Sequence, residues 1–222
     1  YESVMAEPAK EALYVLIDIS ESMCAHLDDV KSAMQMLINQ KILFHKQDAM
    51  GIATMGSDTT ANKLHAELGK GNYEYLSEVH QMGPVNFKTT SAVAGVDSEG
   101  QHADLIDGLC LAMDAVLSFV KALKYSKRVL LITDCESAAS VDESQLDEIA
   151  QQLKQSNIVF SVVAVGLERT DKTAQQIDTL RTLEALRKKI GENMGIMTLA
   201  RADEMLRMLK KRSVRPSSAF RG

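Results

Sequence analysis

The stretch that decides the fold is Ala12-Leu-Tyr-Val-Leu-Ile-Asp18-Ile-Ser20-Glu-Ser22. Its first part, Leu13 to Ile19, is apolar except for one aspartate. Such a run is typical of a strand buried on both faces of a parallel sheet, with helices covering each side. From the end of this run onward, Asp18, Ser20 and Ser22 place one carboxylate and two hydroxyls on alternate residues. The stretch therefore predicts a buried first strand that ends in a polar turn.

Outward from this stretch, apolar runs alternate with amphipathic helical stretches, as in a parallel sheet covered by helices on both faces. Further strands are predicted at 50–55, 128–133, 159–165 and 196–199. Helices are predicted from residue 27 to near His45, at 104–120, from Asp142 to about 153, at 177–186 and at 202–210.

Residues 57–101 are less regular. Turns are expected at 56–60 and 69–72, a short strand suited to a sheet edge at 75–82, and a loop or short helix within 87–100. The whole pattern predicts one α/β domain of the Rossmann-like type, with a mostly parallel central sheet.

Length and composition agree with one soluble domain: 222 residues, 45% of them hydrophobic and 25% charged. No apolar run approaches the ~20 residues that span a bilayer, and the first residues lack the order of a signal peptide, so we expect an intracellular protein without membrane contact. The three cysteines, Cys24, Cys110 and Cys135, are widely spaced, which argues against a disulfide framework or a zinc site.

The formal net charge is −5, which disfavours tight binding of nucleic acid by the chain alone. The end of the chain reverses this balance, because no acid follows Glu204. Its basic residues are Arg207, Lys210, Lys211, Arg212, Arg215 and Arg221. Two interpretations stay open: a solvated tail, or a contact with nucleic acid or the nuclear import machinery through Lys210, Lys211, Arg212 and Arg215.

Candidate functional residues gather where ligands bind in such sheets, just past the carboxyl ends of the strands. Besides the turn at Asp18, Thr133 and Asp134 end a strand, and Asp104 opens a helix after His102 and Ala103. Carboxylate and hydroxyl oxygens suit a hard cation such as Mg²⁺. The alternative is that these side chains accept backbone hydrogen bonds and cap the helices that follow.

Asp-x-Ser-x-Ser at Asp18, Ser20 and Ser22, together with Thr133 and Asp134, resembles the metal-ion-dependent adhesion site of the von Willebrand factor A family. The resemblance implies Asp18, Ser20, Ser22, Asp104 and Asp134 as the residues of a metal site. The family's second loop supplies a threonine, where this sequence has Ala103. The resemblance therefore implies a degenerate site, with Mg²⁺ as the ion it would hold.

Four passages outside that motif resemble the amino-terminal domain of the larger subunit of the Ku heterodimer. They lie at 12–18, 101–108, 121–134 and 213–222. The resemblance implies a nuclear, non-enzymatic docking domain over residues 1–210 and a basic linker over 211–222 that leads to a β-barrel beyond residue 222.

The implied partners are a smaller Ku subunit and factors of end joining and telomere maintenance. Duplex DNA ends would be bound by the full heterodimer, and weakly if at all by this chain. For docking, we expect the exposed faces of the helices on either side of strand 159–165, with Asp147, Glu148, Gln151 and Gln152 on one and Arg181, Glu184, Arg187 and Lys188 on the other.

Two alternatives remain. Another intracellular member of the same family, a proteasomal ubiquitin receptor or a subunit of the transcription-repair helicase complex, would keep the fold and change the partner. A metal-dependent enzyme would use Asp18, Asp104 and Asp134, but the sequence has no Walker-type loop, dinucleotide-binding glycine motif or nucleophile elbow.

Overall fold

Six strands form one sheet at the centre of the molecule, in the order β3-β2-β1-β4-β5-β6. The computed structural model describes residues 10–167 and 172–199. Strands β1, β2, β4, β5 and β6 run parallel, and β3 runs antiparallel to β2 at the edge. The strands are β1 Glu11–Asp18, β2 Ala49–Met55, β3 Leu76–Pro84, β4 Ser126–Thr133, β5 Ile158–Val165 and β6 Met194–Leu199. The predicted α/β fold with a mostly parallel sheet is confirmed, and the edge strand expected at 75–82 is β3.

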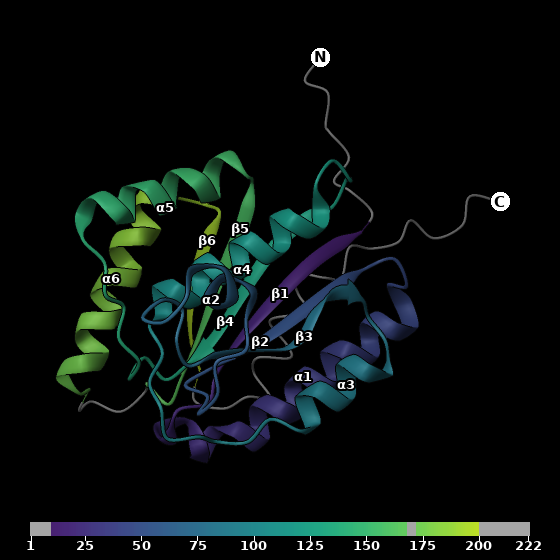
Figure 1. The fold of residues 1–222 in the computed structure, drawn as a ribbon, viewed down its shortest axis with the longest axis horizontal. Coiled ribbons are helices and arrows are strands. Elements are labelled where there is room, and N and C mark those ends of the chain that lie inside the picture. The colour runs from purple at the N-terminus through teal and green to yellow at the C-terminus, as the bar shows by residue number, and fades with distance from the viewer. Residues whose placement is uncertain (1–9, 168–171, 200–222) are drawn as a thin grey trace.

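Helices cover both faces of this sheet (Figure 1). They are α1 Cys24–Phe44, α2 Lys63–Leu68, α3 Phe87–Ala94, α4 Leu105–Val120, α5 Glu143–Gln155 and α6 Ala174–Ile190, with a 3-10 turn at Glu21–Met23. The last predicted helix, 202–210, and the predicted linker, 211–222, lie outside the described residues.

Alternation along β1 divides the core into two layers. Leu13, Val15 and Ile17 belong to the layer that contains residues of α1 and α3, whereas Tyr14 and Leu16 belong to the layer that contains residues of α4, α5 and α6. Successive side chains of a strand point to opposite faces, so a strand of this composition can only be stable with a helical layer on each side. Its residues Ala12 to Asp18 are all buried, which confirms the buried first strand predicted from the sequence.

Helix α4 lies close against the sheet at Gly108. A Cβ atom at this position would lie 2.8 Å from the Met55 sulfur and 3.6 Å from Leu16 Cδ1. The absence of a side chain at Gly108 therefore lets α4 approach β1 and β2, and the start of α4 is held beside the carboxyl ends of the strands.

The sequence assigned no element between the turns expected at 56–60 and 69–72, where the structure has α2. Asn62 caps this helix, its side-chain oxygen accepting a hydrogen bond from the His65 amide at 2.8 Å. Six residues are too few to show helical periodicity, and Leu64 alone packs against the core from this helix. In contrast, α3 is the short helix left open for 87–100, with Asn86 and Thr89 forming a capping box.

Candidate functional site

The rim at the carboxyl ends of β1 and β4 is organised around Asp18, the last residue of β1. One carboxylate oxygen accepts hydrogen bonds from the Ser20 hydroxyl at 2.7 Å and the Ser20 amide at 3.1 Å. The other accepts from the Thr133 hydroxyl at 2.7 Å and the Ser137 hydroxyl at 3.0 Å. Asp18 therefore ties its own turn to the loop after β4.

Thr133 is oriented by the backbone that follows it. The Cys135 amide donates to the Thr133 hydroxyl oxygen at 2.9 Å, which leaves the hydroxyl proton for Asp18. Cys135 adopts a left-handed conformation with φ of 66°, so the chain turns sharply here. Burial, together with the neighbouring carboxylates, raises the pKa of the Cys135 thiol to about 12, so this cysteine is not a nucleophile at neutral pH.

The electrostatics at Asp18 favour a nearby positive charge. Burial raises the pKa of the Asp18 carboxyl above its ordinary value. Hydrogen bonds from Thr133 and Ser20 lower the pKa in part, and the negative charge of Asp134 raises it again. A cation close to this carboxylate would stabilise its ionised form.

Four of the five predicted metal-site residues come together at this rim. The Ser20 and Ser22 hydroxyl oxygens lie 3.2 Å apart, with Ser20 buried and Ser22 exposed. Asp134 is buried and close enough for its charge to act on Asp18, and it accepts a hydrogen bond from the Glu136 amide at 3.0 Å. Ser20, Ser22, Asp18 and Asp134 are therefore the oxygen donors available to an ion here.

Asp104 has a different role. One of its oxygens accepts from the Ile106 amide at 2.7 Å and the Asp107 amide at 3.4 Å, which caps α4. The other accepts from the Ser140 amide at 2.7 Å. Among the described residues, no hydrogen bond joins Asp104 to Asp18 or Asp134, so Asp104 acts as a helix cap.

The fit of the rim to a metal ion is consequently partial. Ala103, at the position of the family's threonine, is buried and offers no side-chain oxygen. Across residues 10–167 and 172–199, no three His, Cys, Asp or Glu side chains form a group that could hold a metal ion. A magnesium ion here stays a prediction, and it would depend mainly on the two serine hydroxyls.

The structure adds residues that the sequence did not point to. Ser137 donates to Asp18, and its backbone oxygen accepts from the buried Thr179 hydroxyl of α6 at 2.9 Å. Gln176 of the same helix donates to the Asp134 backbone oxygen at 3.1 Å. Ser137 lies four residues after Thr133 in an irregular loop, so neither strand nor helix spacing could have identified it.

Two predictions about sites remain: the basic residues near the end of the chain and the catalytic use of three aspartates. Lys210, Lys211, Arg212 and Arg215 lie outside the described residues. The enzyme alternative required Asp18, Asp104 and Asp134 in one place, and Asp104 is instead bound to backbone amides of α4 and the loop at Ser140.

A family model for the von Willebrand factor type A domain matches residues 12–194. The chain is 24% identical over 218 residues to ATP-dependent DNA helicase 2 subunit KU80 of Oryza sativa subsp. japonica, covering 96% of this chain and 31% of that protein. The protein of the same name in Arabidopsis thaliana is 26% identical over 227 residues, covering 96% and 32%. X-ray repair cross-complementing protein 5 of Dictyostelium discoideum is 22% identical over 236 residues, covering 97% and 29%. The chain thus spans less than a third of the length of these relatives.

Solved structures agree on the fold. The VWA domain of SpRpn10 superimposes with a TM-score of 0.62 at 19% identity, covering 91% of this chain and 95% of that one. The pilus adhesin SpaC from Lactobacillus rhamnosus GG gives a TM-score of 0.64 at 11% identity, covering 94% and 30%. At these identities the likeness concerns the fold alone.

Among the described helices, none is both long and apolar enough to cross a membrane. The strand order, the Asp18-Ser20-Ser22 turn beside Thr133 and the match over residues 12–194 lead to one conclusion. The chain belongs to the von Willebrand factor A family, and within that family its curated relatives include Ku80 subunits.

Proposed function

We propose that this chain is the protein-docking domain of a Ku80-like subunit, which acts in the nucleus within a DNA-end-binding heterodimer. The observation that carries the proposal is the similarity to Ku80 subunits over 96% or more of the chain. The name of the Dictyostelium relative refers to X-ray repair. The proposed processes are double-strand break repair by non-homologous end joining and, with the same partner subunit, telomere maintenance.

The hydrogen bonds of the rim carboxylates argue against a catalytic role for them, and so favour a binding role for the domain. Both oxygens of Asp18 and both oxygens of Asp104 accept hydrogen bonds from neighbouring hydroxyls or amides. A general base must be able to reach a substrate proton, and these carboxylates are already bound to their own loops. The polar rim therefore acts chiefly to fix the loops, and partners would be recognised by surfaces outside it.

The outer faces of α5 and α6 are our candidate for docking. Asp147 of α5 accepts from Lys189 of α6 at 2.6 Å, so an exposed ion pair bridges the two helices. Glu148 and Gln152 of α5 are exposed beside it. A rigid helix pair with exposed polar side chains is a surface on which a partner can be selected by charge.

The experiment is affinity capture of the endogenous protein that carries this chain, from nuclear extract treated with nuclease. We expect a smaller Ku subunit in equal amount. Glu148→Lys combined with Gln152→Ala should reduce the recovery of end-joining factors while the smaller subunit is retained. A matched variant on α2, Glu67→Lys, should change neither.

Two results would contradict the proposal. Recovery of proteasome subunits in place of a Ku subunit would favour the alternative of a proteasomal member of the same family. Tight binding of duplex DNA by the isolated chain at physiological salt would contradict the division between docking domain and DNA-binding ring, because the chain's net charge of −5 predicts weak, salt-sensitive binding.

A further inference from the structure

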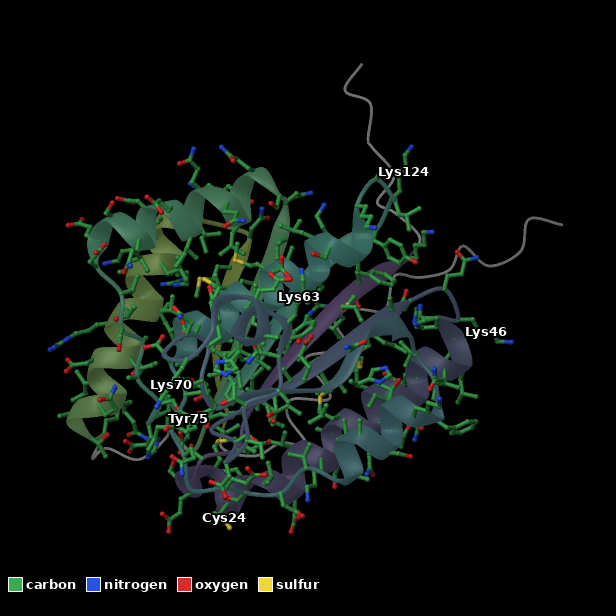
Figure 2. All side chains as sticks on the ribbon, viewed as in Figure 1. Cys24, Lys46, Lys63, Lys70, Tyr75 and Lys124 are labelled. Carbon is green, nitrogen blue, oxygen red and sulfur yellow. The ribbon has the colours of Figure 1, made fainter. Side chains whose placement is uncertain are left out.

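The end of the sheet opposite the rim, where the parallel strands begin, is rich in lysine. Strands β1, β2 and β4 begin there, since they run parallel to one another. We call this surface the lysine edge; its basic members are Lys10, Lys46, Lys121, Lys124 and Lys127. Figure 2 shows Lys46 and Lys124 at this end of the molecule, with Cys24, Lys70 and Tyr75 at the other. This surface is an exception, since the whole chain has a net charge of −5.

The acids at this edge are already neutralised. Lys41 donates to Glu11 and to Asp48 at 2.6 Å each, and Arg128 donates to Glu11 at 2.9 Å. Lys41 and Asp48 are buried. Among the ion pairs of residues 10–167 and 172–199, none involves Lys10, Lys46 or Lys124. Glu11 and Asp48 therefore do not cancel the charge that these lysines present to solvent.

A cavity of about 400 Å³ lies within the lysine edge. Lys10, Lys46, Asp48, Pro84, Phe119 and Tyr125 are among the residues that line it. Lys10 Nζ lies 4.5 Å from the centre of the Tyr125 ring, which in turn meets the Phe119 ring edge-on with centroids 5.7 Å apart. A volume of this size accommodates one side chain of a ligand, which would meet Phe119, Tyr125 and Pro84 and have the side chains of Lys10 and Lys46 beside it.

Large apolar side chains are exposed around the same edge. Phe44, two residues before Lys46, is 75% exposed, and Phe87, three residues after Pro84, is 78% exposed. Leu123, next to Lys124, is 55% exposed. Apolar side chains interleaved with lysines match a polypeptide, which offers both carboxylates and apolar groups, better than they match a phosphate backbone.

We propose that the lysine edge binds an acidic peptide segment of a partner protein, with an apolar side chain of that segment in the cavity and its carboxylates on Lys10 and Lys46. The net negative charge of the rest of the domain opposes a long polyanion more than a short acidic peptide, because screening limits charge effects to about 8 Å at physiological salt. The inference rests on the proposed docking role, but it concerns a different surface and does not depend on the Ku partner.

The test uses fluorescence anisotropy with the 222-residue chain and a short labelled peptide of glutamates and aspartates around one central phenylalanine. We expect saturable binding at low salt. Lys10→Glu combined with Lys46→Glu should weaken it at least tenfold, and alanine in place of the peptide's phenylalanine should weaken it about tenfold. Raising the salt concentration should also weaken binding, because the contacts are mainly between exposed charges.

The control carries the same change of charge elsewhere: Lys70→Glu with Lys172→Glu, both exposed and remote from this edge. It should alter the affinity less than twofold. Since Lys10 contacts Tyr125, a second variant, Lys46→Glu with Lys124→Glu, changes only exposed lysines and should weaken peptide binding without lowering the unfolding midpoint.

Three outcomes overturn the inference: no peptide binding at low salt, equal loss in the control, or a duplex oligonucleotide that binds more tightly than the peptide through the same lysines. The last outcome would make the edge a nucleic-acid surface. Any of them can occur while a smaller Ku subunit is still captured, so failure here is distinguishable from failure of the proposed function.

Discussion

Asp18→Ala is the substitution that best tests the account of the rim. The carboxylate accepts four hydrogen bonds in a buried position, from Ser20 amide and hydroxyl, Thr133 and Ser137. After its removal the Ser20 hydroxyl can still turn to Ser22, 3.2 Å away. For the Thr133 and Ser137 hydroxyls, no second acceptor is recorded among the hydrogen bonds of the described residues.

The magnitude follows from those two hydroxyls. A buried polar group left without its partner costs about 1–3 kcal/mol, so two of them cost roughly 2–6 kcal/mol. Removing the carboxylate also recovers part of its desolvation cost, because burial raises the pKa of Asp18 in the folded state. We expect a net loss of about 2–4 kcal/mol, which lowers the melting temperature of a chain this long by about 4–16 °C.

The assay is urea-induced unfolding followed by far-ultraviolet circular dichroism, with the denaturant slope compared between proteins. Asp18→Asn keeps the shape and one acceptor oxygen, so it should lose about half as much as Asp18→Ala. Asp29→Ala, an exposed position on α1, should stay within about 0.5 kcal/mol of wild type. If Asp18→Ala lowers the free energy of unfolding no more than this control does, the hydrogen bonds of Asp18 do not stabilise the rim, and this account of the rim is refuted.

Three further predictions concern the rim and the lysine edge. A magnesium ion at the rim should add about 2.7 kcal/mol to the unfolding free energy at 100 times its dissociation constant, and Ser22→Ala should abolish this gain in a Mg²⁺ titration; no gain in wild type would leave the rim a capping motif. Asp104→Ala should lower stability by about 1–2 kcal/mol in urea unfolding but leave the Mg²⁺ response intact, and loss of that response would make Asp104 a ligand. Burial raises the pKa of Glu11, but Lys41 and Arg128 outweigh it and lower the pKa below 4.5, so its stabilising contribution is complete above pH 4.5 and is lost as the pH falls through the folded-state value. The stability gap between wild type and Glu11→Gln should therefore shrink below pH 4.5, and a gap that is constant with pH would argue against the ion pairs.

Most of the fold could be predicted because the central strands β1 and β5, and the second half of β4, are buried on both faces. Burial on both faces gives long apolar runs, and the runs at 13–19, 128–133 and 159–165 locate β1, β4 and β5 to within two residues at their starts. The short helix α2 could not be located this way, since its stability comes from the Asn62 cap and one packed leucine. Helices this short lack a pattern of their own.

The residues of the candidate site that lie at strand ends could be predicted from the sequence. Those whose position depends on the course of a loop could not. Asp18 and Asp134 follow neighbouring parallel strands, so topology alone brings them to one edge. Asp104 also opens a helix at that edge, but the loop at 138–140 pairs with the start of α4 through the Leu105 amide and the Ala138 oxygen. That contact turns the Asp104 carboxylate toward the Ser140 amide, and no sequence spacing reveals it.

Charged side chains are hydrogen-bonded within the domain at the rim, but among the described residues several remain without an ion pair at the lysine edge. This difference favours the lysine edge as the place where a charged partner binds. At the rim, the carboxylates of the buried Asp18 and the half-buried Asp104 accept hydrogen bonds from hydroxyls and amides of the same chain. At the lysine edge, Lys41 neutralises Glu11 and Asp48, so the lysines beside the cavity keep their net positive charge. A strand of 8 residues separates the two ends by roughly 26 Å, at about 3.3 Å per residue, which exceeds the screening length at physiological salt. An acidic partner at the lysine edge is therefore not repelled by the carboxylates of the rim, and the domain can hold both surfaces without conflict between them.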